Sequence, residues 1–198
     1  EGLHWHSPLP ETDNLNDWQL LPRKPDWAAD WRELWTPGAE GAHTRLQRFL
    51  EDRLADYGDA RDIPGVSATS GLSPHLHHGE ISPRSIWHAT QAWAEQHPQS
   101  RAAADKFLAE LGWREFSYHL LVFFPEIPAK AFKPAFDEFP WAGSQKQLQA
   151  WQRGQTGYPI VDAGMRELWA TGYMHNRARM VTASFLTKHL LIDWRAGE

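Results

Sequence analysis

The chain has 198 residues, a formal net charge of −5 at pH 7 and a hydrophobic content of 41%. This length suits one domain of ordinary size, and no run approaches the ~18 apolar residues that a membrane-spanning helix needs. The chain contains no cysteine, which excludes disulfides and thiolate chemistry. We therefore expect no membrane partner and a cytoplasmic location.

Charged residues are unevenly distributed between the two halves of the chain, and tryptophan is unusually frequent. Residues 1–100 hold eight Lys and Arg against fifteen Asp and Glu, whereas residues 101–198 hold twelve against ten. A local basic face in the second half would suit a phosphate backbone, although an ordinary solvated surface explains the same counts. The twelve tryptophans are typical of core packing, but indole rings also stack on bases or flavins and pass electrons.

The first half of the chain predicts two helices behind an irregular segment. Residues 1–38 contain five prolines and no sustained helical period, which favours a linker. From Ala39 the i, i+3, i+4 spacing of apolar residues predicts a helix that ends at Gly58. Residues 62–81 are rich in Gly, Ser and Pro and predict a loop. A serine–proline pair then indicates a helix over 82–97.

The second half predicts four further helices. The first spans 100–124 and is expected to be capped by its initial serine. Residues 125–143 are irregular. Two helices follow over 144–154 and 156–172, the latter ended by a glycine, and the last runs over 174–192. Because no segment shows the alternation of a strand, the chain is predicted to be all-α.

One face of the long helix carries side chains that suit binding. Glu110, Trp113, Arg114 and Ser117 are spaced i, i+3, i+4 and i+7, and therefore share this face. The opposite face, within 107–123, carries the apolar side chains and is expected to be core. One interpretation is an exposed Glu–Arg pair, which stabilises a helix by a few tenths of a kcal/mol. The other is a face on which the indole stacks on a base.

The stretch SATSGLS, residues 67–73, combines hydroxyls with a glycine. Such groups can converge on a phosphate, although Ser/Gly loops are common. The motifs GxGxxG, GxxxxGK[ST], GxSxG and HExxH are all missing. Ordinary nucleotide folds, a serine hydrolase elbow and a zinc site are therefore unsupported, and we expect no metal.

The stretch TGYMHNRARM, residues 171–180, concentrates polar side chains at the head of an apolar helix. Asn176 and Arg179 lie i, i+3 on one face, whereas Arg177 points elsewhere. Arg179 is expected to be partly buried, and a buried guanidinium needs a carboxylate or phosphate partner. Asp162 is one candidate within the chain; a ligand or a further segment is another.

Three long motifs then identify a family. They are TSGLSPHLHHGEISPR, ELGWREFSYHLL and WQRGQTGYPIVDAGMRELWATGYMHNRARMVTASFLTKHLLIDWRAGE. In this order they resemble the FAD-binding helical domain of the DNA photolyase/cryptochrome family, over about residues 40–198, and most of all the bacterial class I cyclobutane pyrimidine dimer photolyases. The resemblance implies an interdomain linker over 1–38 and part of the FAD-binding helical domain over 39–198.

The resemblance also implies an activity. The parent protein would be a deoxyribodipyrimidine photo-lyase, a carbon–carbon lyase that repairs pyrimidine dimers in damaged DNA by light-dependent electron transfer from reduced FAD. The dimer would be flipped out of the duplex, which costs less where stacking is already disrupted.

Positions in these motifs imply roles for individual residues. The resemblance assigns FAD contacts to Tyr57, Thr69, Ser70, Gly71, Leu72, Ser73, Phe107 and Arg179. It assigns catalytic roles at the lesion to Glu110, Trp113 and Asn176. It assigns DNA contacts to Arg61, Glu110, Trp113, Arg114, Asn176 and Arg177. It assigns electron transfer to the flavin to Trp141 and Trp194.

The sequence departs from the family pattern in several places. It ends before the DGDxAxNxxxxQW segment, which supplies the aspartate partner of Arg179, and the preceding α/β antenna domain is missing, so the antenna chromophore stays open. We expect a piece of a longer parent, inactive alone, whose FAD affinity is weak or absent. Its exposed, unfinished core would permit dimerisation. Tyr173 replaces the usual tryptophan of GWMHNR, and Phe107 stands where a related bacterial enzyme has a tryptophan.

Two other functions remain open from the sequence. A cryptochrome-type blue-light photoreceptor shares the flavin site but signals; Glu110 and Trp113 favour repair, because signalling members often lose the tryptophan. A non-catalytic helical DNA-binding module would use the same basic, aromatic face. It predicts salt-sensitive DNA binding without flavin dependence.

Overall fold

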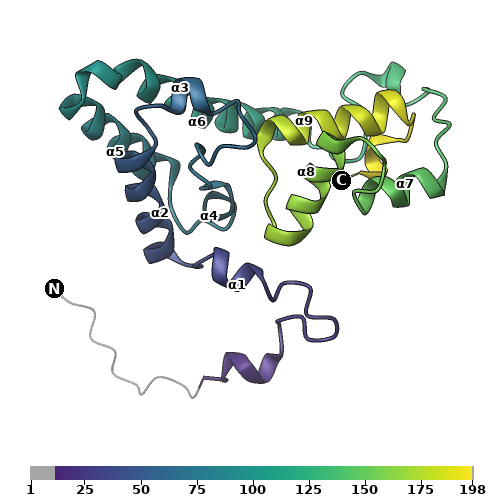
Figure 1. The fold of residues 1–198 in the computed structure, drawn as a ribbon, viewed down its shortest axis with the longest axis horizontal. Coiled ribbons are helices and arrows are strands. Elements are labelled where there is room, and N and C mark those ends of the chain that lie inside the picture. Colours follow the sequence, from purple (N-terminus) through teal and green to yellow (C-terminus); the bar gives the residue numbers. More distant parts are fainter. Residues whose placement is uncertain (1–11, 198) are drawn as a thin grey trace.

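The computed structural model describes residues 12–197 (Figure 1). Within this range the chain forms helices joined by turns and irregular segments, with no strand, so the all-α prediction is confirmed. No helix among the described residues is long and apolar enough to cross a membrane.

Most connections between the α-helices are short, but longer irregular stretches join α3 to α4 and α6 to α7. They are α1 (Trp31–Leu34), α2 (Ala39–Asp52), α3 (Tyr57–Ala60), α4 (Ser73–His77), α5 (Pro83–Gln96), α6 (Arg101–Phe123), α7 (Gln145–Gln152), α8 (Pro159–Thr171) and α9 (Asn176–Ser184). A π-helical turn, η4 (Phe185–His189), continues α9. Short 3-10 turns lie at η1 (Leu15–Trp18), η2 (Pro98–Ser100), η3 (Pro134–Phe136) and η5 (Trp194–Ala196).

Helix ends with clear local chemistry lie where the sequence predicts them. The hydroxyl of Ser82 accepts the backbone N–H of the residue three positions on at 3.0 Å, and Ser144 forms a complete capping box. Gly172 ends α8 with φ of +71°, a conformation that favours glycine. The cap predicted at Ser100 is wrong, because this residue ends η2 and its side chain makes no cap hydrogen bond.

Other predicted boundaries are wrong where an apolar pattern runs through a turn. The first long helix ends at Asp52 rather than Gly58, because the amides of Arg53 and Leu54 both bond to the carbonyl of Phe49 and close a turn. The fully buried Leu54 continues the apolar pattern across that turn. The predicted loop over 62–81 contains α4, and the last predicted helix is divided between α9 and η4.

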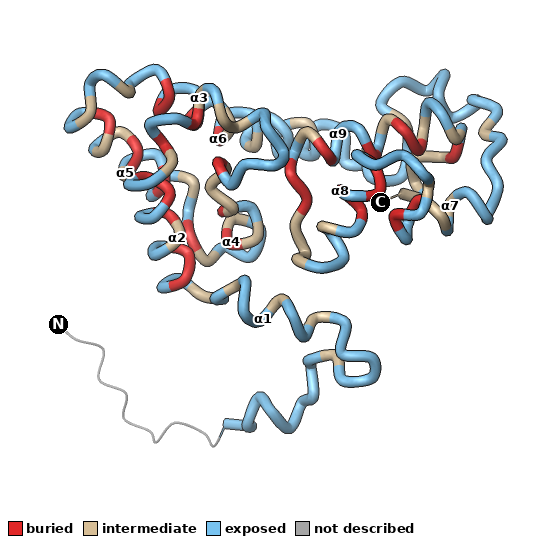
Figure 2. Tube along the Cα trace, in the orientation of Figure 1, coloured by how far each residue is buried: buried red, intermediate tan, exposed pale blue. Residues whose placement is uncertain are grey.

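The buried apolar side chains form two separate clusters. The first joins α2, α3, α5 and the start of α6, with Phe49, Leu54 and Ile86 almost completely enclosed. The second joins α7, α8, α9 and η4 around Trp151 and Val161. Figure 2 shows the buried positions gathered along α2 and α5 on one side and near α7 to α9 on the other. The molecule therefore has two cores with a seam between them.

Only the first half of α6 belongs to a core. Phe107, Leu108 and Leu111 are buried, as predicted. Phe116 and Phe123 are 48% and 64% exposed, so the predicted core stripe is wrong beyond Leu111. The reason is tertiary: the C-terminal half of α6 extends past the first cluster (Figure 1).

The segment before α2 connects the two halves. The indole N–H of Trp31 donates to the carbonyl of Trp169 at 3.1 Å, and that of Trp35 donates to the carbonyl of Thr171 at 2.7 Å. The guanidinium of Arg45, from α2, lies 4.4 Å above the Trp35 ring. This part of the predicted linker is thus packed between α2 and the end of α8.

We expect Trp35→Phe to lower the free energy of unfolding by about 1–2 kcal/mol, because the smaller phenyl ring loses part of the packing of the indole and the carbonyl of Thr171 loses its donor. Urea denaturation measures the loss. The control is Trp18→Phe, since Trp18 is 54% exposed and should change stability by less than about 0.5 kcal/mol. Equal losses in both variants would contradict a role for this hydrogen bond.

Candidate functional site

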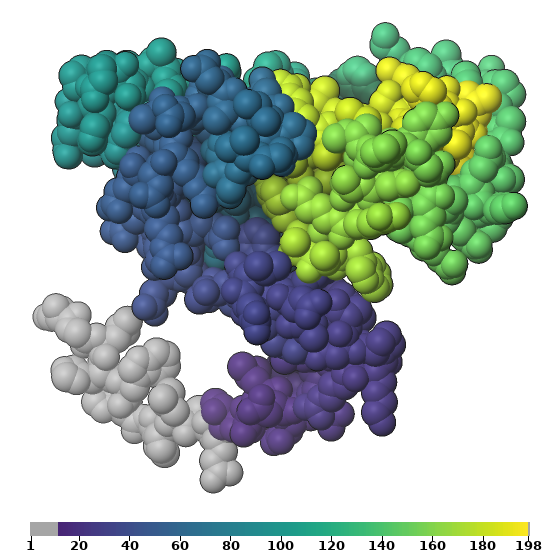
Figure 3. Space-filling view, in the orientation of Figure 1, coloured from purple at the N-terminus to yellow at the C-terminus, as the bar shows by residue number. Residues whose placement is uncertain are grey.

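A cleft of about 510 Å³ lies between residues of the two core clusters. One wall comes from α3, the loop before α4 and the middle of α6, and the other comes from residues 173–179. Figure 3 shows the blue first-half surface and the yellow-green α8–α9 surface meeting along a seam. Because its walls belong to different cores, the cleft depends on contacts that cross this seam.

The cleft brings together most of the predicted site residues, although they are far apart in the sequence. It is lined by Tyr57, Arg61, Thr69, Ser70, Gly71, Leu72, Ser73, Phe107, Glu110, Arg114, Asn176 and Arg179. Trp113 and Arg177 do not line it. The Trp113 ring is 64% exposed and packs edge-on against Phe116, and Arg177 is engaged outside the cleft by Asp62.

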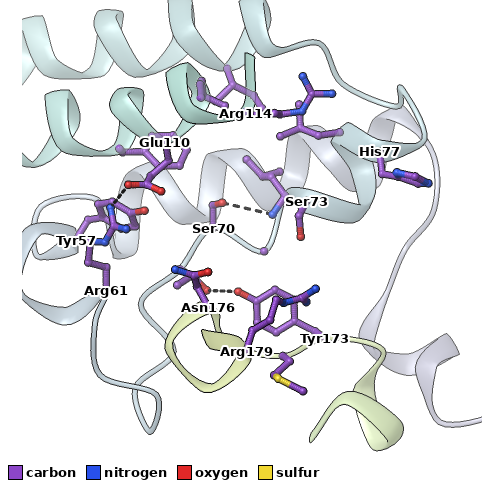
Figure 4. A pocket seen from close by; sticks show the side chains of 18 of the residues that line it. Tyr57, Arg61, Ser70, Ser73, His77, Glu110, Arg114, Tyr173, Asn176 and Arg179 are labelled. Atoms are coloured by element: carbon purple, nitrogen blue, oxygen red, sulfur yellow. Dashed lines mark hydrogen bonds and ion pairs between the residues drawn. The ribbon is translucent and has the colours of Figure 1, made fainter. Parts of the chain in front are cut away.

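The hydroxyl-rich loop forms part of the first wall (Figure 4). The amide of Leu72 donates to the hydroxyl of Ser70 at 3.4 Å. Gly71 has φ of +63°, and a Cβ at this position would lie 2.9 Å from the Arg45 guanidinium. Glycine is therefore favoured here by conformation, whereas the tip of the flexible Arg45 side chain can shift to admit a Cβ. The loop presents the hydroxyls of Ser70 and Ser73 toward a ligand space.

Tyr173 joins the two walls. Its hydroxyl lies 3.1 Å from the hydroxyl of Thr69, 104 residues away in the sequence (Figure 4). The ring also packs near Trp35, with centroids 6.3 Å apart. From the sequence, Tyr173 stands out only as a departure from the family pattern, with no role implied. Its position in the polar stretch 171–180 was the available signal.

Glu110 is paired with Arg61 rather than with a residue of its own helix. Arg61 donates to the Glu110 carboxylate at 2.5 Å, and this hydrogen bond raises the pKa of Arg61. The possible Glu110–Arg114 pair is wrong, because Arg114 donates to Glu115 at 2.7 Å. Arg61 also lies 5.2 Å above the Tyr57 ring. Burial raises the pKa of Tyr57 to about 12, although Arg61 opposes the shift, so this phenol is neutral at pH 7.

Arg179 is exposed on the cleft wall, which corrects its predicted partial burial. Asp162 is not its partner: that carboxylate accepts hydrogen bonds from the hydroxyl and amide of Thr156 at 2.6 and 2.8 Å, and from the amide of Gly157 at 2.9 Å. Among residues 12–197, no carboxylate lies within salt-bridge distance of the Arg179 guanidinium.

The charges and surfaces of the cleft fit an anionic ligand with an aromatic part. Three arginines line it against one glutamate. Two of these arginines are paired with carboxylates, so the positive charge of Arg179 is left over. Tyr57, Phe107 and Leu111 supply apolar wall. A dinucleotide that combines a diphosphate with a flat ring system matches these features.

The two predicted electron-transfer residues line a second groove, of about 860 Å³. Phe139 packs on Trp141 with centroids 4.6 Å apart. The amides of the next two residues both donate to the carbonyl of Leu191, at 2.9 and 3.1 Å, which ties this loop to the chain before Trp194. Trp194 also lines a third pocket, of about 490 Å³, together with Arg179. Because Arg179 also lines the first cleft, this pocket shares lining residues with both the second groove and the first cleft.

No group of three or more His, Asp or Glu side chains in the described part of the chain is arranged to hold a metal ion. The expectation of no metal stays a prediction.

Comparisons with known proteins agree on one family. Residues 107–198 match the family model of the FAD binding domain of DNA photolyase. A deoxyribodipyrimidine photo-lyase from Agrobacterium fabrum is 53% identical over 96% of this chain, and the chain spans 39% of that relative's length.

Solved structures resemble the same domain. The crystal structure of a bacterial class III photolyase from Agrobacterium tumefaciens is 53% identical, with a TM-score of 0.90 over 95% of this chain and 39% of the other. A Synechocystis cryptochrome is 37% identical, with a TM-score of 0.76 over 82% of this chain and 34% of the other. With both sequence and helical fold in agreement, this chain belongs to the DNA photolyase and cryptochrome family.

Proposed function

We propose that the protein binds FAD in the cleft and serves light-dependent repair of cyclobutane pyrimidine dimers in DNA as part of a longer parent, a deoxyribodipyrimidine photo-lyase. The observation that carries this proposal is the meeting of Arg179, which has no carboxylate partner among the described residues, with the Arg61–Glu110 pair and the hydroxyl loop in one cleft. The similar Agrobacterium protein is a deoxyribodipyrimidine photo-lyase. Bound and reduced FAD would supply the light-driven electron that splits the dimer.

The residues divide the work by position. The loop Thr69–Ser73 and Arg179 would hold the negative diphosphate and the ring system, because they offer hydroxyls and a positive charge on opposite walls. Tyr57 and Phe107 would exclude water from the ring system. Apolar and aromatic walls are typical of such sites.

The lesion would meet the α6 face. Glu110 can accept hydrogen bonds from a pyrimidine, and its hydrogen bond from Arg61 holds the carboxylate in place. Trp113 lies one turn further along α6 with an open ring face, which suits stacking on an extruded base. Asn176 faces the same cleft. Arg61, Arg114 and Arg177 would contact phosphates.

Trp141 and Trp194 would deliver electrons to the flavin. Support comes from the second groove, which both tryptophans line, and from the further pocket that Trp194 lines together with Arg179.

The test is FAD retention followed by repair. The longer parent protein is incubated with FAD, desalted and scanned for the flavin absorption band, then reduced and illuminated with thymine-dimer oligonucleotides, with a dark control. Light-dependent loss of dimers supports the proposal. A retained flavin without repair would favour the cryptochrome-type alternative, and DNA binding without flavin would favour the DNA-binding module.

Finer predictions remain to be tested. Class I membership stays a prediction, and the similar Agrobacterium structure is of a class III photolyase. Dimerisation stays a prediction that the exposed apolar side chains of Phe116, Val122 and Phe123 on α6 favour. The cytoplasmic location also stays a prediction, and the antenna chromophore stays open.

A further inference from the structure

Asp62 lies between two arginines that come from opposite sides of the seam. Its carboxylate accepts from the Nε and Nη2 atoms of Arg177 at 2.9 and 2.8 Å, and from Nε of Arg61 at 3.4 Å. Arg61 follows α3, whereas Arg177 lies in the first turn of α9, 115 residues from Asp62 in the sequence. One carboxylate thus connects the two walls of the cleft at its rim.

The contact makes a row of alternating charges. Glu110, Arg61, Asp62 and Arg177 follow one another through ion pairs, and their formal charges cancel. The Asp62 and Arg177 side chains are 44% and 42% exposed, so a phosphate from solvent can approach them. Although partial desolvation opposes the shift, hydrogen bonds and charges from Arg177 and Arg61 hold the pKa of Asp62 below its usual range. The carboxylate is therefore charged at pH 7.

The Asp62 carboxylate holds the Arg177 guanidinium in a defined position. Its Nε and Nη2 atoms are engaged on one carboxylate oxygen, while Nη1 lies 3.5 Å from the sulfur of Met180. A guanidinium fixed in this way loses less side-chain freedom when it binds a second anion than a mobile one does. At the same time, the negative charge of Asp62 repels any phosphate that approaches the rim without making other contacts.

We propose that Asp62 is a positioning and specificity-determining residue, which fixes Arg177 for DNA seated on the cleft and weakens indiscriminate binding of DNA phosphates. The inference rests on the proposed function, because DNA is the ligand. Removing the carboxylate charge then has opposite effects on the two kinds of complex. Undamaged DNA gains from the additional net positive charge, whereas DNA with a dimer in the cleft loses the positioned guanidinium.

The experiment compares Asp62→Asn with the wild-type protein, with FAD present. Dissociation constants are measured over a salt series for an undamaged duplex and for the same duplex with one thymine dimer. We expect undamaged binding to tighten roughly threefold to tenfold, with a salt dependence steeper by about 0.9. Binding of the damaged duplex should not tighten. The dissociation constant of the undamaged duplex divided by that of the damaged duplex should therefore fall.

Controls separate positioning from a general charge effect. Asp59→Asn makes the same change three residues away, on an exposed side chain outside the row of ion pairs, and should preserve the ratio. Asp62→Glu keeps the negative charge and should retain much of the wild-type ratio of dissociation constants. In an Arg177→Gln background, Asp62→Asn should no longer change the ratio. Because the Asp62–Arg177 pair is exposed, urea denaturation should show similar stability for Asp59→Asn and Asp62→Asn.

The outcomes distinguish this inference from the proposed function. If the wild-type protein binds neither duplex at low salt, the DNA-repair proposal fails and the inference fails with it. If the wild-type protein prefers the damaged duplex and Asp62→Asn keeps that preference, only the inference is overturned. Equal ratios in Asp59→Asn and Asp62→Asn, or a wild-type protein without preference, overturn it as well.

Discussion

Replacing Arg179 by alanine in the full-length parent is expected to remove most of the FAD that the protein retains. Within residues 12–197, Arg179 is the cleft arginine that has no carboxylate partner, so its guanidinium has donors available to the cofactor. A hydrogen bond to a charged group contributes about 1.5–3 kcal/mol. Its loss corresponds to a dissociation constant for FAD that is roughly tenfold to hundredfold larger. Titration of FAD, followed by the change in flavin fluorescence, measures the difference.

Arg153→Ala is the matched control for this prediction. Arg153 is an exposed arginine at the end of α7 and is absent from the cleft lining, so its replacement removes the same charge at a distance. FAD affinity should stay close to wild type. Arg179→Lys should retain an intermediate affinity, because the charge remains but the planar donors do not. Undiminished binding by Arg179→Ala would show that this residue does not hold the cofactor.

Helix ends were predictable where one or two neighbouring residues decide the geometry. The hydroxyls of Ser82 and Ser144 satisfy free amides at the starts of α5 and α7, and Gly172 adopts the left-handed conformation that ends α8. These interactions span only a few residues, so the sequence contains all that is needed. The end of α2 could not be predicted in this way, because the buried Leu54 continues the apolar spacing of the helix while the backbone turns.

The partners of the site residues could not be predicted from helical spacing. Glu110 has an arginine four positions on in its own helix, yet it pairs with Arg61 from α3. That choice depends on the packing of α3 against α6 through Tyr57 and Phe107. Motif resemblance placed most of the residues in one site, but it assigned no role to Asp62. The signal was its position directly after Arg61.

Replacing Asp162 by alanine is expected to give the largest loss of stability. The carboxylate is 8% exposed and holds the turn before α8 through Thr156 and Gly157. Truncation leaves three donors without their acceptor, and we expect the free energy of unfolding to fall by about 3 kcal/mol at pH 7. Asp105→Ala is the control: Asp105 forms an exposed i, i+4 pair with Arg101, worth at most about 0.5 kcal/mol.

The contribution of the Asp162 carboxylate to the free energy of unfolding should decrease at acidic pH. Burial acts to raise the pKa of Asp162, but the hydrogen bonds from Thr156 and Gly157 outweigh it and hold the pKa below its usual range. A carboxyl whose folded pKa is depressed stabilises the protein fully above its unfolded pKa, about 3.9, and progressively less as pH falls through the folded value. The stability difference between wild type and Asp162→Asn should therefore be constant near neutrality and shrink below about pH 4. Urea denaturation over this range measures it, and a difference that stays constant in acid would mean that the carboxylate charge is not what holds the turn.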